Sequence, residues 1–451
     1  MEVALASLDE LRLSLEGTAL APGDPGYEEA RRCFNALVDR RPAVIARCHG
    51  RSDVAAAFDF ARQHDLEVAV RGGGHNPAGH CVLDGGLVID LSAMRRVEVD
   101  GAERIARADG GATWLDFDAA TQAFGLVTPG GVVGSTGVAG LTFGGGIGHL
   151  TTQYGLTCDN IVGAELVTPE GSVVRAGGDG DDELLWALRG GGGNFGVATR
   201  LEFRLHPLER VVGGLFVYRG RGVRDGLLVF RDLVAGSPRD LSCQVVLAFD
   251  ESAAPMLVVA PCYTGSDPDP AELRELRSVP GLASDDVRER PFLEQQTLFD
   301  SPYGENRHYW KGHFVRELPD ELIEVLLEGL VALGRPPGGF LIESLHGAPK
   351  DTDGSTAVVG FRRAAFNLSA MATWDDPALD DQYIAWARDM AAAMEPWSFS
   401  GGGYVNYMQA DEPIERVRAG FGAEAFERLR ALKSRYDPDN LLRRNQNIPP
   451  I

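Results

Sequence analysis

The sequence predicts an α+β protein made of two parts that differ in their pattern of helices, strands and glycine clusters. Its 451 residues, 44% of them hydrophobic, suffice for more than one core. Up to about residue 207, short strand-like and helix-like runs are separated by clusters of glycine. From about residue 208, longer strand-like runs alternate with helices, which is typical of a domain built on an antiparallel sheet. This change in the pattern of secondary structure places a domain boundary near residue 208.

The first part is expected to begin with a short helix and a loop rich in proline and glycine, within residues 1–26. Ser52 can cap the helix that follows it, whose apolar residues recur at helical spacing. Strands on either side of this helix predict a β-α-β unit. Helices are expected at 27–35, 53–64, 113–123 and 181–189, and strands at 41–46, 67–70, 87–91, 97–100, 104–108, 161–169, 172–176 and 197–205.

The second part is expected to combine an antiparallel sheet with helices. After residue 400 the chain returns to dense motifs and ends with a helix at 424–436 and a polar tail. No internal repeat and no low-complexity segment is found in the sequence. Strands are expected at 213–218, 241–249, 255–263, 339–344 and 364–372, and helices at 222–235, 270–276, 319–333 and 379–394.

Charge and composition limit the partners. The net charge of -22 disfavours nucleic acid and anionic membranes, because both require basic patches. The start of the sequence has no basic and apolar leader, and no run approaches the ~18 apolar residues that span a membrane, so a cytoplasmic protein is expected. The six cysteines are scattered without a CxxC pair, so neither a disulfide framework nor a metal site is expected.

One stretch indicates a ligand site. Within residues 68–76, an apolar run ends in three glycines that are followed directly by His75. Glycines let the backbone turn sharply and bring its N–H groups close to a ligand, most often a phosphate. A histidine directly after such a nest lies beside whatever the ligand carries. His75 could instead be a structural loop histidine, and His80 and His149 are alternative ligand-facing histidines.

A second glycine motif, Gly191-x-Gly193-x-x-Gly196, matches the dinucleotide-binding pattern but stands in the wrong context. A Rossmann site requires a strand, then the glycines, then a helix, whereas here a helix precedes and a strand follows. The sequence contains no GxxxxGK[ST] motif, which excludes a P-loop nucleotidase.

Candidate catalytic residues lie in the second half of the chain. Glu343 sits in a strand-like run whose alternation places it on a face with Leu341 and Leu345, and a carboxylate there is costly unless it has a role or a partner. A salt bridge to Arg362 or Arg363 is the alternative interpretation. Tyr404 and Tyr407 follow a glycine run, and ordinary aromatic packing is their alternative. Cys158 could be reactive, although a lone cysteine between apolar strands is more often a small core residue.

Taken together, the motifs resemble the berberine bridge enzyme-like FAD-linked oxidases, in the vanillyl-alcohol oxidase/p-cresol methylhydroxylase (PCMH) superfamily. The bacterial branch is the most similar. Any one motif is weak, but their order along the chain is specific. The matching elements are Val70-Arg71-Gly72-Gly73-Gly74-His75, residues 84–91, 141–148, 154–160 and 185–196, Tyr436-Asp437-Pro438, and residues 445–450.

This resemblance implies a fold of two subdomains that bind FAD, a PCMH-type domain at 1–207. It also implies an antiparallel-sheet substrate domain with helices at 208–400 and a segment at 401–451 that returns to the FAD domain. His75 would carry the 8α-methyl group of FAD. The second, cysteinyl link of some members falls on Gly137 here, so a single link is expected. Cys158 lies in a different motif and is not expected to take that role.

The resemblance also assigns the site residues. Tyr407 matches a tyrosine base of some members and is slightly favoured over Glu343, which matches a glutamate base of others. Tyr303, His308, Tyr309 and Lys311 form a polar-aromatic cluster expected near the substrate pocket, without an assigned role. The cofactor-binding residues implied are Arg71, Gly72, Gly73, Gly74, His75, Asn76, Gly79, His80, Thr136, Gly137, Gly140, Gly144, Gly145, Gly148, Asp159, Asn160, Ile161, Gly196, Val197, Tyr404, Asn406, Asn445 and Asn447.

The function implied is hydride transfer from a small-molecule alcohol, amine or phenol to flavin N5, with O2 as the acceptor, in secondary metabolism or catabolism. Two alternatives stay open. One is a flavin oxygenase that tailors a natural product such as a polyketide, and the other is a flavin-binding protein without turnover. The expected partners are the small-molecule substrate and O2, with no nucleic acid or membrane, and the chain is expected to be a monomer or homodimer.

Overall fold

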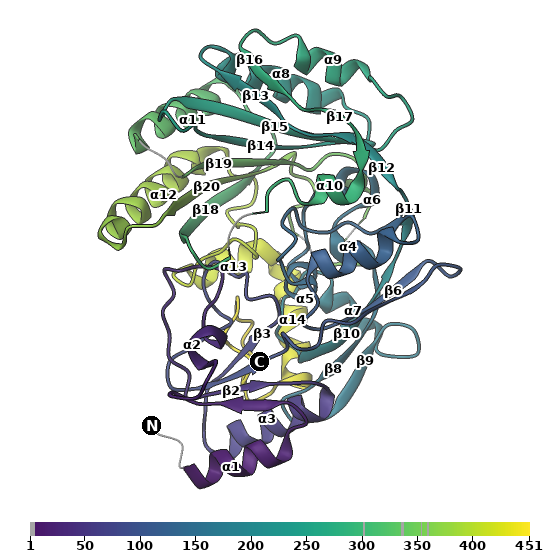
Figure 1. Cartoon of the computed structure of the whole chain (residues 1–451), viewed down its shortest axis with the longest axis vertical. Helices are drawn as coiled ribbons and strands as arrows, with labels where there is room; N and C mark the ends of the chain where they lie inside the picture. Colours follow the sequence, from purple (N-terminus) through teal and green to yellow (C-terminus); the bar gives the residue numbers. More distant parts are fainter. Residues whose placement is uncertain (1–4, 301–302, 335–337, 353, 359) are drawn as a thin grey trace.

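The computed structural model describes residues 5–300, 303–334, 338–352, 354–358 and 360–451. Figure 1 shows two parts stacked along the long axis. The N-terminal residues and the C-terminal residues, drawn in purple, blue and yellow, build the lower part, and the teal and green middle residues build the upper part. Antiparallel sheets dominate both parts, which confirms the α+β class. No helix among the described residues is both long and apolar enough to cross a membrane.

A small sheet in the order β1-β2-β4-β3 forms the base of the lower part. β2 and β3 both pair with β4 in parallel, so β4 lies between the two strands of the predicted β-α-β unit. The sequence did not predict β1, which pairs antiparallel with β2. An apolar core joins this sheet to the first helices. The bounds are α1 Leu5–Ser14, β1 Thr18–Leu20, β2 Val44–Arg47, α3 Arg51–Gln63, β3 Val68–Arg71 and β4 Leu87–Asp90.

The predicted cap of α3 is wrong. The helix begins at Arg51 with Gly50 as its N-cap, so Ser52 lies inside the first turn and makes no cap bond. Asp53 is the buried polar residue of this turn instead. Its carboxylate accepts backbone hydrogen bonds from Glu16 (2.8 Å), Gly17 (3.0 Å) and His49 (2.8 Å), and so fixes three loop amides at the helix start.

The helix predicted at 27–35 is shorter than expected, because α2 covers only Tyr27–Ala30. The residues that follow make tertiary contacts instead of continuing the helix. The buried side-chain amide of Asn35 donates to the carbonyl oxygens of Pro77 (2.6 Å) and His308 (2.7 Å), and its oxygen accepts from His308 N–H (2.8 Å). Residues 33–36, which we call the bridging segment, therefore connect the lower part to the upper part.

A second sheet of the lower part has the order β5-β6-β10-β8-β9 and is antiparallel, as the predicted strand pair and hairpin require. Thr113 caps α4 with a capping box to Asp116. The bounds are β5 Val97–Asp100, β6 Ile105–Asp109, α4 Trp114–Gln122, β7 Leu126–Val127, α5 Val138–Phe143, α6 Thr151–Tyr154, a 3-10 turn Thr157–Asp159, β8 Ile161–Val167, β9 Val173–Ala176, α7 Asp182–Leu188, β10 Val197–Arg204 and β11 His206–Pro207.

One large antiparallel sheet builds the upper part, in the order β16-β13-β15-β14-β19-β20-β18, with β12 pairing β15 and β17. Helices α8, α11 and α12 cover one face over an apolar core, and the other face looks down on the lower part (Figure 1). The bounds are β12 Arg210–Gly213, β13 Phe216–Arg219, α8 Gly222–Gly236, β14 Leu241–Phe249, β15 Pro255–Tyr263, α9 Ala271–Arg277, β16 Leu282–Asp285, β17 Arg288–Pro291, α10 Phe292–Gln296, β18 Arg307–Val315, α11 Asp320–Leu333, β19 Gly338–Ser344, 3-10 turns Ala348–Asp351, Pro377–Leu379 and Glu395–Trp397, β20 Phe366–Trp374 and α12 Asp380–Met394.

The strand predicted at 213–218 is wrong in one respect. It is divided between β12 and β13 because Gly214 takes a φ of 137°, which breaks the extended backbone. The sequence also did not predict β18, an edge strand rich in histidine and aromatic residues, or the short strands β16 and β17. β18 matters most, because it reaches the site described below.

The C-terminal segment returns to the lower part with α13 Ile414–Phe421, which was not predicted, and α14 Ala423–Tyr436. A fully buried ion pair anchors it. Lys433 Nζ lies 2.6 Å from Asp437 Oδ2 and also donates to the carbonyl oxygens of Asn194 and Leu442, both at 2.9 Å. With all three protons paired, this lysine fixes the tail against the glycine-rich loop that precedes β10.

Candidate active site between the glycine loops and the large sheet

A cavity of about 550 Å³ lies between the two parts of the molecule. Glycine-rich loops form its lower wall, strands β14, β18, β19 and β20 form its upper wall, and the C-terminal segment closes it. The predicted residues that line the cavity are Gly72, Gly73, Gly74, His75, Asn76, His80, Thr136, Gly137, Gly140, Gly144, Gly196, Val197, Asn406, Tyr407 and Asn445.

Other predicted residues lie outside the lining. Asp159 forms an ion pair with Arg362, and Asn160 Oδ1 accepts a hydrogen bond from His206 Nε2 at 2.7 Å. These contacts support the loops behind the wall, and a role in cofactor binding stays a prediction for this group. Its members are Arg71, Gly79, Gly145, Gly148, Asp159, Asn160, Ile161, Tyr404 and Asn447, and the catalytic candidate Glu343 also lies outside the lining.

Two loops of the lower wall approach each other backbone to backbone. A Cβ atom at Gly73 would lie less than 3.0 Å from the backbone of Gly137, and the loops therefore touch without side chains. The same contact bears on the expectation that residue 137 carries no second link. A side chain at Gly137 would meet the Gly73 backbone just as closely, so this chain leaves no room for it unless the loops shift.

The C-terminal segment completes the second glycine loop. A Cβ atom at Gly144 would collide with the Asn406 side chain, whose amide donates to the carbonyl oxygen of Leu141 (3.0 Å) and to Tyr404 Oη (2.9 Å). Tyr404 Oη in turn accepts from the N–H groups of Gly146 (3.1 Å) and Ile147 (3.2 Å). Tyr404 is therefore a buried scaffold residue whose hydroxyl is fully engaged.

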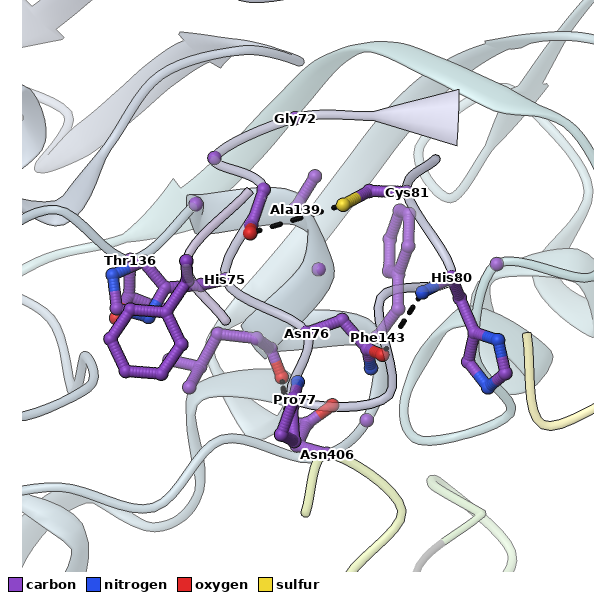
Figure 2. Close-up of a pocket in the computed structure, with 18 of the residues that line it drawn as sticks. Gly72, His75, Asn76, Pro77, His80, Cys81, Thr136, Ala139, Phe143 and Asn406 are labelled. Atoms are coloured by element: carbon purple, nitrogen blue, oxygen red, sulfur yellow. Dashed lines mark hydrogen bonds between the residues drawn. The ribbon is translucent and has the colours of Figure 1, made fainter. Parts of the chain in front are cut away.

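His75 is held in a stack of rings on one side of the cavity (Figure 2). Its ring lies parallel to Phe34 with centroids 4.2 Å apart, and Phe34 stacks in turn on His308 at 4.3 Å. His75 Nε2 lies 2.7 Å from Ser135 Oγ. Burial, helped by His308, lowers the pKa of His75 to about 3, so the ring is neutral at physiological pH and keeps a nitrogen lone pair.

Partnerless polar atoms mark a different region of the cavity, on the opposite side of the view in Figure 2 where His80 lies. His80 Nε2, Arg444 Nε and Asn445 Oδ1 are buried without a hydrogen-bond partner among the described residues. Burial first, and then the nearby Arg444, lowers the pKa of His80 to about 4. The sequence analysis missed Arg444, although it is the charged residue beside the recognised Asn445 motif. These groups suit a bound polar molecule.

Tyr407 enters the cavity from the C-terminal segment and is backed by Glu343 on β19. The Tyr407 hydroxyl lies 3.4 Å from Glu343 Oε1, and Asn367 Nδ2 donates to Glu343 Oε2 at 2.6 Å. Burial raises the pKa of Glu343 to about 7, against the lowering effect of these two hydrogen bonds. Burial, followed by Glu343 and Tyr404, raises the pKa of Tyr407 well above its usual range.

The alternative interpretation of Glu343 as a salt-bridge partner is wrong for Arg362. The Arg362 guanidinium donates to Asp159 Oδ2 at 2.9 Å instead. Among the described residues Glu343 has no ion pair, and only hydrogen bonds reach it. A fully buried carboxylic acid with a pKa near neutrality can take or give a proton, which an ion-paired carboxylate does less readily.

The predicted cluster on and before β18 is divided by strand alternation. Tyr303, ahead of the strand, donates to the carbonyl oxygens of Gly73 (3.1 Å) and Gly74 (3.2 Å). His308 lines the cavity together with Trp310, which the sequence analysis missed. Tyr309 and Lys311 face the opposite way, where both contact Asp411.

His149 and Cys158 do not line the cavity. His149 is buried with both ring nitrogens unpartnered among the described residues, and its ring lies parallel to Phe299 at 6.1 Å. Cys158 is fully buried in an apolar cluster, as its core interpretation predicts. The Gly191–Gly196 motif lies between α7 and β10, so its context is not that of a Rossmann site, although Gly192, Gly193 and Gly196 line the cavity.

Comparison with known proteins identifies the fold and the cofactor. Residues 42–177 match the FAD binding domain family, and residues 403–449 match the family described as berberine and berberine like. The (R)-6-hydroxynicotine oxidase of Paenarthrobacter nicotinovorans is 32% identical over 97% of this chain and 98% of its own length. The chain belongs to the berberine bridge enzyme-like FAD-linked oxidoreductases. It is an FAD-dependent enzyme, as expected.

Other berberine bridge enzyme-like proteins agree. An FAD-linked oxidoreductase of Dictyostelium discoideum is 29% identical over 98% of this chain and 97% of its own length. The crystal structure of 6-hydroxy-D-nicotine oxidase from Arthrobacter nicotinovorans superposes with a TM-score of 0.88 at 30% identity, covering 97% of this chain and 99% of that one. A berberine bridge enzyme-like protein of Physcomitrella patens, 20% identical with a TM-score of 0.86 over 96% and 97% of the two chains, shows the fold alone.

The cavity of this berberine bridge enzyme-like chain fits FAD on its own features. The loops of the lower wall meet at glycines, so backbone faces the cavity there. A flat ring system and a phosphate chain can approach such backbone closely. The unpartnered atoms His80 Nε2, Arg444 Nε and Asn445 Oδ1 supply donors and an acceptor for the polar half of a dinucleotide.

Proposed function

We propose that this enzyme is an FAD-dependent oxidase whose cofactor is bonded to His75 and whose substrate is a small aromatic alcohol, amine or phenol. The observation that carries the proposal is that one cavity brings together a neutral buried histidine and a tyrosine backed by a protonatable glutamate. The first group suits attachment of a cofactor, and the second suits proton removal from a substrate.

Three features support a bond at His75. The residue directly follows the glycine nest, its ring is fixed by Phe34 and Ser135, and its pKa of about 3 keeps it unprotonated. A neutral, oriented imidazole is the form that attacks an electrophilic carbon. Gly137, packed against Gly73, supports a single link rather than two.

Proton removal is proposed to involve both catalytic candidates. FAD, when bound, would supply the chemistry of hydride acceptance and of electron transfer to O2. Tyr407 faces the cavity and receives the proton of a substrate O–H or N–H, while its own proton moves to Glu343 Oε1. Asn367 holds the other carboxylate oxygen and so orients Glu343 for this transfer. Tyr407 is the group that contacts the substrate, because Glu343 does not line the cavity.

The upper wall supports an aromatic or apolar substrate. Val246, Leu341, Met371 and Trp310 line it, and Arg444 is the permanently charged residue among the described lining residues. An anionic substrate would therefore find no positive partner on the sheet side. The name of the relative (R)-6-hydroxynicotine oxidase supports a small-molecule donor of this general kind.

The test is anaerobic mixing of the purified enzyme with a panel of aromatic alcohols, amines and phenols, followed by admission of O2. We expect at least one compound to bleach the flavin absorbance, and one equivalent of hydrogen peroxide to form for each equivalent of product. Labelled oxygen in the product, with less than stoichiometric peroxide, would instead establish an oxygenase. Absence of flavin reduction by every compound, on a protein that retains flavin, would support a binding protein.

A further inference from the structure

The cavity wall contains a pair of cysteines that the proposed reaction does not use. Cys81 lines the cavity on the loop that follows His75, and Cys33 stands at the start of the bridging segment. Both are buried in one small apolar cluster. In sequence they are far apart, and no sequence motif connects them.

Gly74 brings the two cysteines together. The Cys81 thiol lies 3.9 Å from the carbonyl oxygen of Gly74, a contact that Figure 2 shows, and the N–H of Phe34 donates to the same oxygen at 3.0 Å. Cys33, which precedes Phe34, directs its own thiol to the carbonyl oxygen of Asn35 at 3.5 Å. The carbonyl oxygen of the residue that precedes His75 is thus contacted both by the Cys81 thiol and by the backbone of the residue next to Cys33.

The surroundings favour oxidation of this pair. Interaction with the Cys81 thiol is the largest cause that lowers the pKa of Cys33, and the buried Arg71 guanidinium lowers it further. The same contact and burial raise the pKa of Cys81, so Cys33 is the more readily deprotonated of the two thiols. Two cysteines in one buried cluster, one of them with a lowered pKa, are the arrangement of a redox-sensitive dithiol.

We propose that Cys33 and Cys81 form a peroxide-sensitive dithiol that closes to a disulfide between the His75 loop and the bridging segment. The Cys33 thiolate attacks one oxygen of hydrogen peroxide, the O–O bond breaks, and the departing hydroxide takes a proton to leave as water. The Cys81 sulfur then attacks the sulfenic acid of Cys33 and a second water leaves. In sum, two thiols and one peroxide give one disulfide and two waters.

The site has a local source of oxidant if the oxidase function proposed above holds, since O2 reduction in this cavity yields peroxide. Closure would also tie down Phe34, whose ring lies between His75 and His308. The disulfide would join residues 33 and 81 across a long loop, so we expect the closed form to unfold at a higher temperature.

The chain offers a matched control. Cys243 and Cys262 lie on neighbouring strands β14 and β15, and both are buried. Burial alone raises the pKa of the Cys243 thiol to about 12, and burial followed by Cys243 raises that of Cys262. This second pair therefore shares the burial of the first but lacks its cation and its place on the cavity wall.

The experiment treats the intact holoenzyme with a few equivalents of hydrogen peroxide, denatures it in iodoacetamide and digests it with trypsin. Cleavage gives peptides 33–40 and 72–95, the second of which carries both His75 and Cys81. We expect these peptides to be joined with the loss of two hydrogens, at least ten times faster than any loss of alkylation at Cys243 and Cys262. The unfolding temperature should rise and return to its starting value with dithiothreitol.

Two variants separate the steps. In Cys81→Ser the sulfenic acid of Cys33 should persist and react with dimedone, whereas Cys33→Ser should show neither the adduct nor the rise in unfolding temperature. Equal alkylation of all six cysteines after peroxide would overturn the proposal, and this result needs only the wild-type chain. If added peroxide closes the pair but aerobic turnover with substrate does not, the dithiol stands and the oxidase source of peroxide fails.

Discussion

The two walls of the cavity differ in whether backbone or side chains face the interior. The lower wall presents backbone, at positions such as Gly73 and Gly137 where a Cβ atom would approach within 3.0 Å of the opposite loop. The upper wall presents side chains from four strands, among them Met371 and Trp310. A backbone wall fixes the distance of closest approach, while a side-chain wall can change its volume and chemistry without moving a strand.

This difference separates two tasks. A cofactor that every molecule of the enzyme must hold in one position suits the backbone wall, since glycine at such positions has no acceptable substitute. A substrate suits the side-chain wall, because volume-conserving changes in apolar side chains cost little. We therefore expect substitutions in the lower wall to affect the cofactor and those in the upper wall to affect the substrate.

The largest effect should come from the one side chain of the lower wall that is proposed to bond the cofactor. In His75→Ala no flavin should stay with the protein after acid precipitation, whereas the wild-type pellet should be yellow and its peptide 72–95 should carry the flavin. Flavin that survives acid in the variant would refute the link.

Tyr407→Phe removes the proposed proton acceptor and leaves the lower wall intact. We expect flavin reduction by substrate to slow by about 10²- to 10⁴-fold, the usual contribution of a positioned base. Reoxidation by O2 and acid-stable flavin content should stay close to wild type. An unchanged reduction rate in stopped-flow measurements would transfer the role of base to Glu343.

Glu343→Gln keeps the shape of the side chain and an acceptor oxygen for Asn367 but removes the group that titrates. In the wild type the rate of flavin reduction should rise with pH through about 7 and then level off, because only the deprotonated carboxylate can take the proton of Tyr407. The variant should be slower, by about tenfold or more. The inflection near pH 7 should vanish from its profile, and an inflection that persists would assign it to another group.

Gly73→Ala tests the backbone wall directly. The new methyl group would be forced against Gly137, so we expect a loss of about 1–3 kcal/mol in the free energy of unfolding and poor flavin loading. Gly140→Ala is the matched control, since its Cβ atom would have no protein atom within 4 Å and its unfolding temperature should stay near wild type. Equal tolerance of both changes would remove the distinction between the walls.

The smallest effect is expected in the upper wall. Met371→Leu conserves volume and should cost less than about 1.5 kcal/mol in stability, with full acid-stable flavin. Its measurable consequence should be a change in KM among aromatic substrates of different size. Loss of flavin from this variant would show that the upper wall, too, serves the cofactor.

The two walls also differ in how far the sequence predicted them. The lower wall was recognisable because a backbone requirement leaves glycines at fixed spacing, as in Gly72–His75 and in the run before Asn406. Tyr407 was predicted for the same reason, through its place in a motif. The upper wall leaves no such trace, since Trp310 and Met371 come from strands distant in sequence and any apolar residue can occupy an inward position.

The errors in secondary structure have a related cause. α2 ends early because Asn35 binds backbone atoms of Pro77 and His308, contacts that no local pattern reveals. β18 was missed because its charged and polar residues depend on partners supplied by the fold, such as Asp411 for Lys311. Arg444 was missed although it stands beside a recognised asparagine, because its use depends on a cavity that the sequence does not show.

The buried anchor of the C-terminal segment has a consequence for biosynthesis. The cavity is lined both by Phe34 and by residues 442–446, so its last wall residues leave the ribosome roughly 20 to 80 s after its first, at usual elongation rates. Until the C-terminal segment packs against the lower part, the loop before β10 lacks the contact with Lys433 and the cavity lacks its last wall residues. Cofactor uptake therefore follows translation. The apolar lining of the cavity stays exposed in the nascent chain for most of the time between synthesis of its first and last residues.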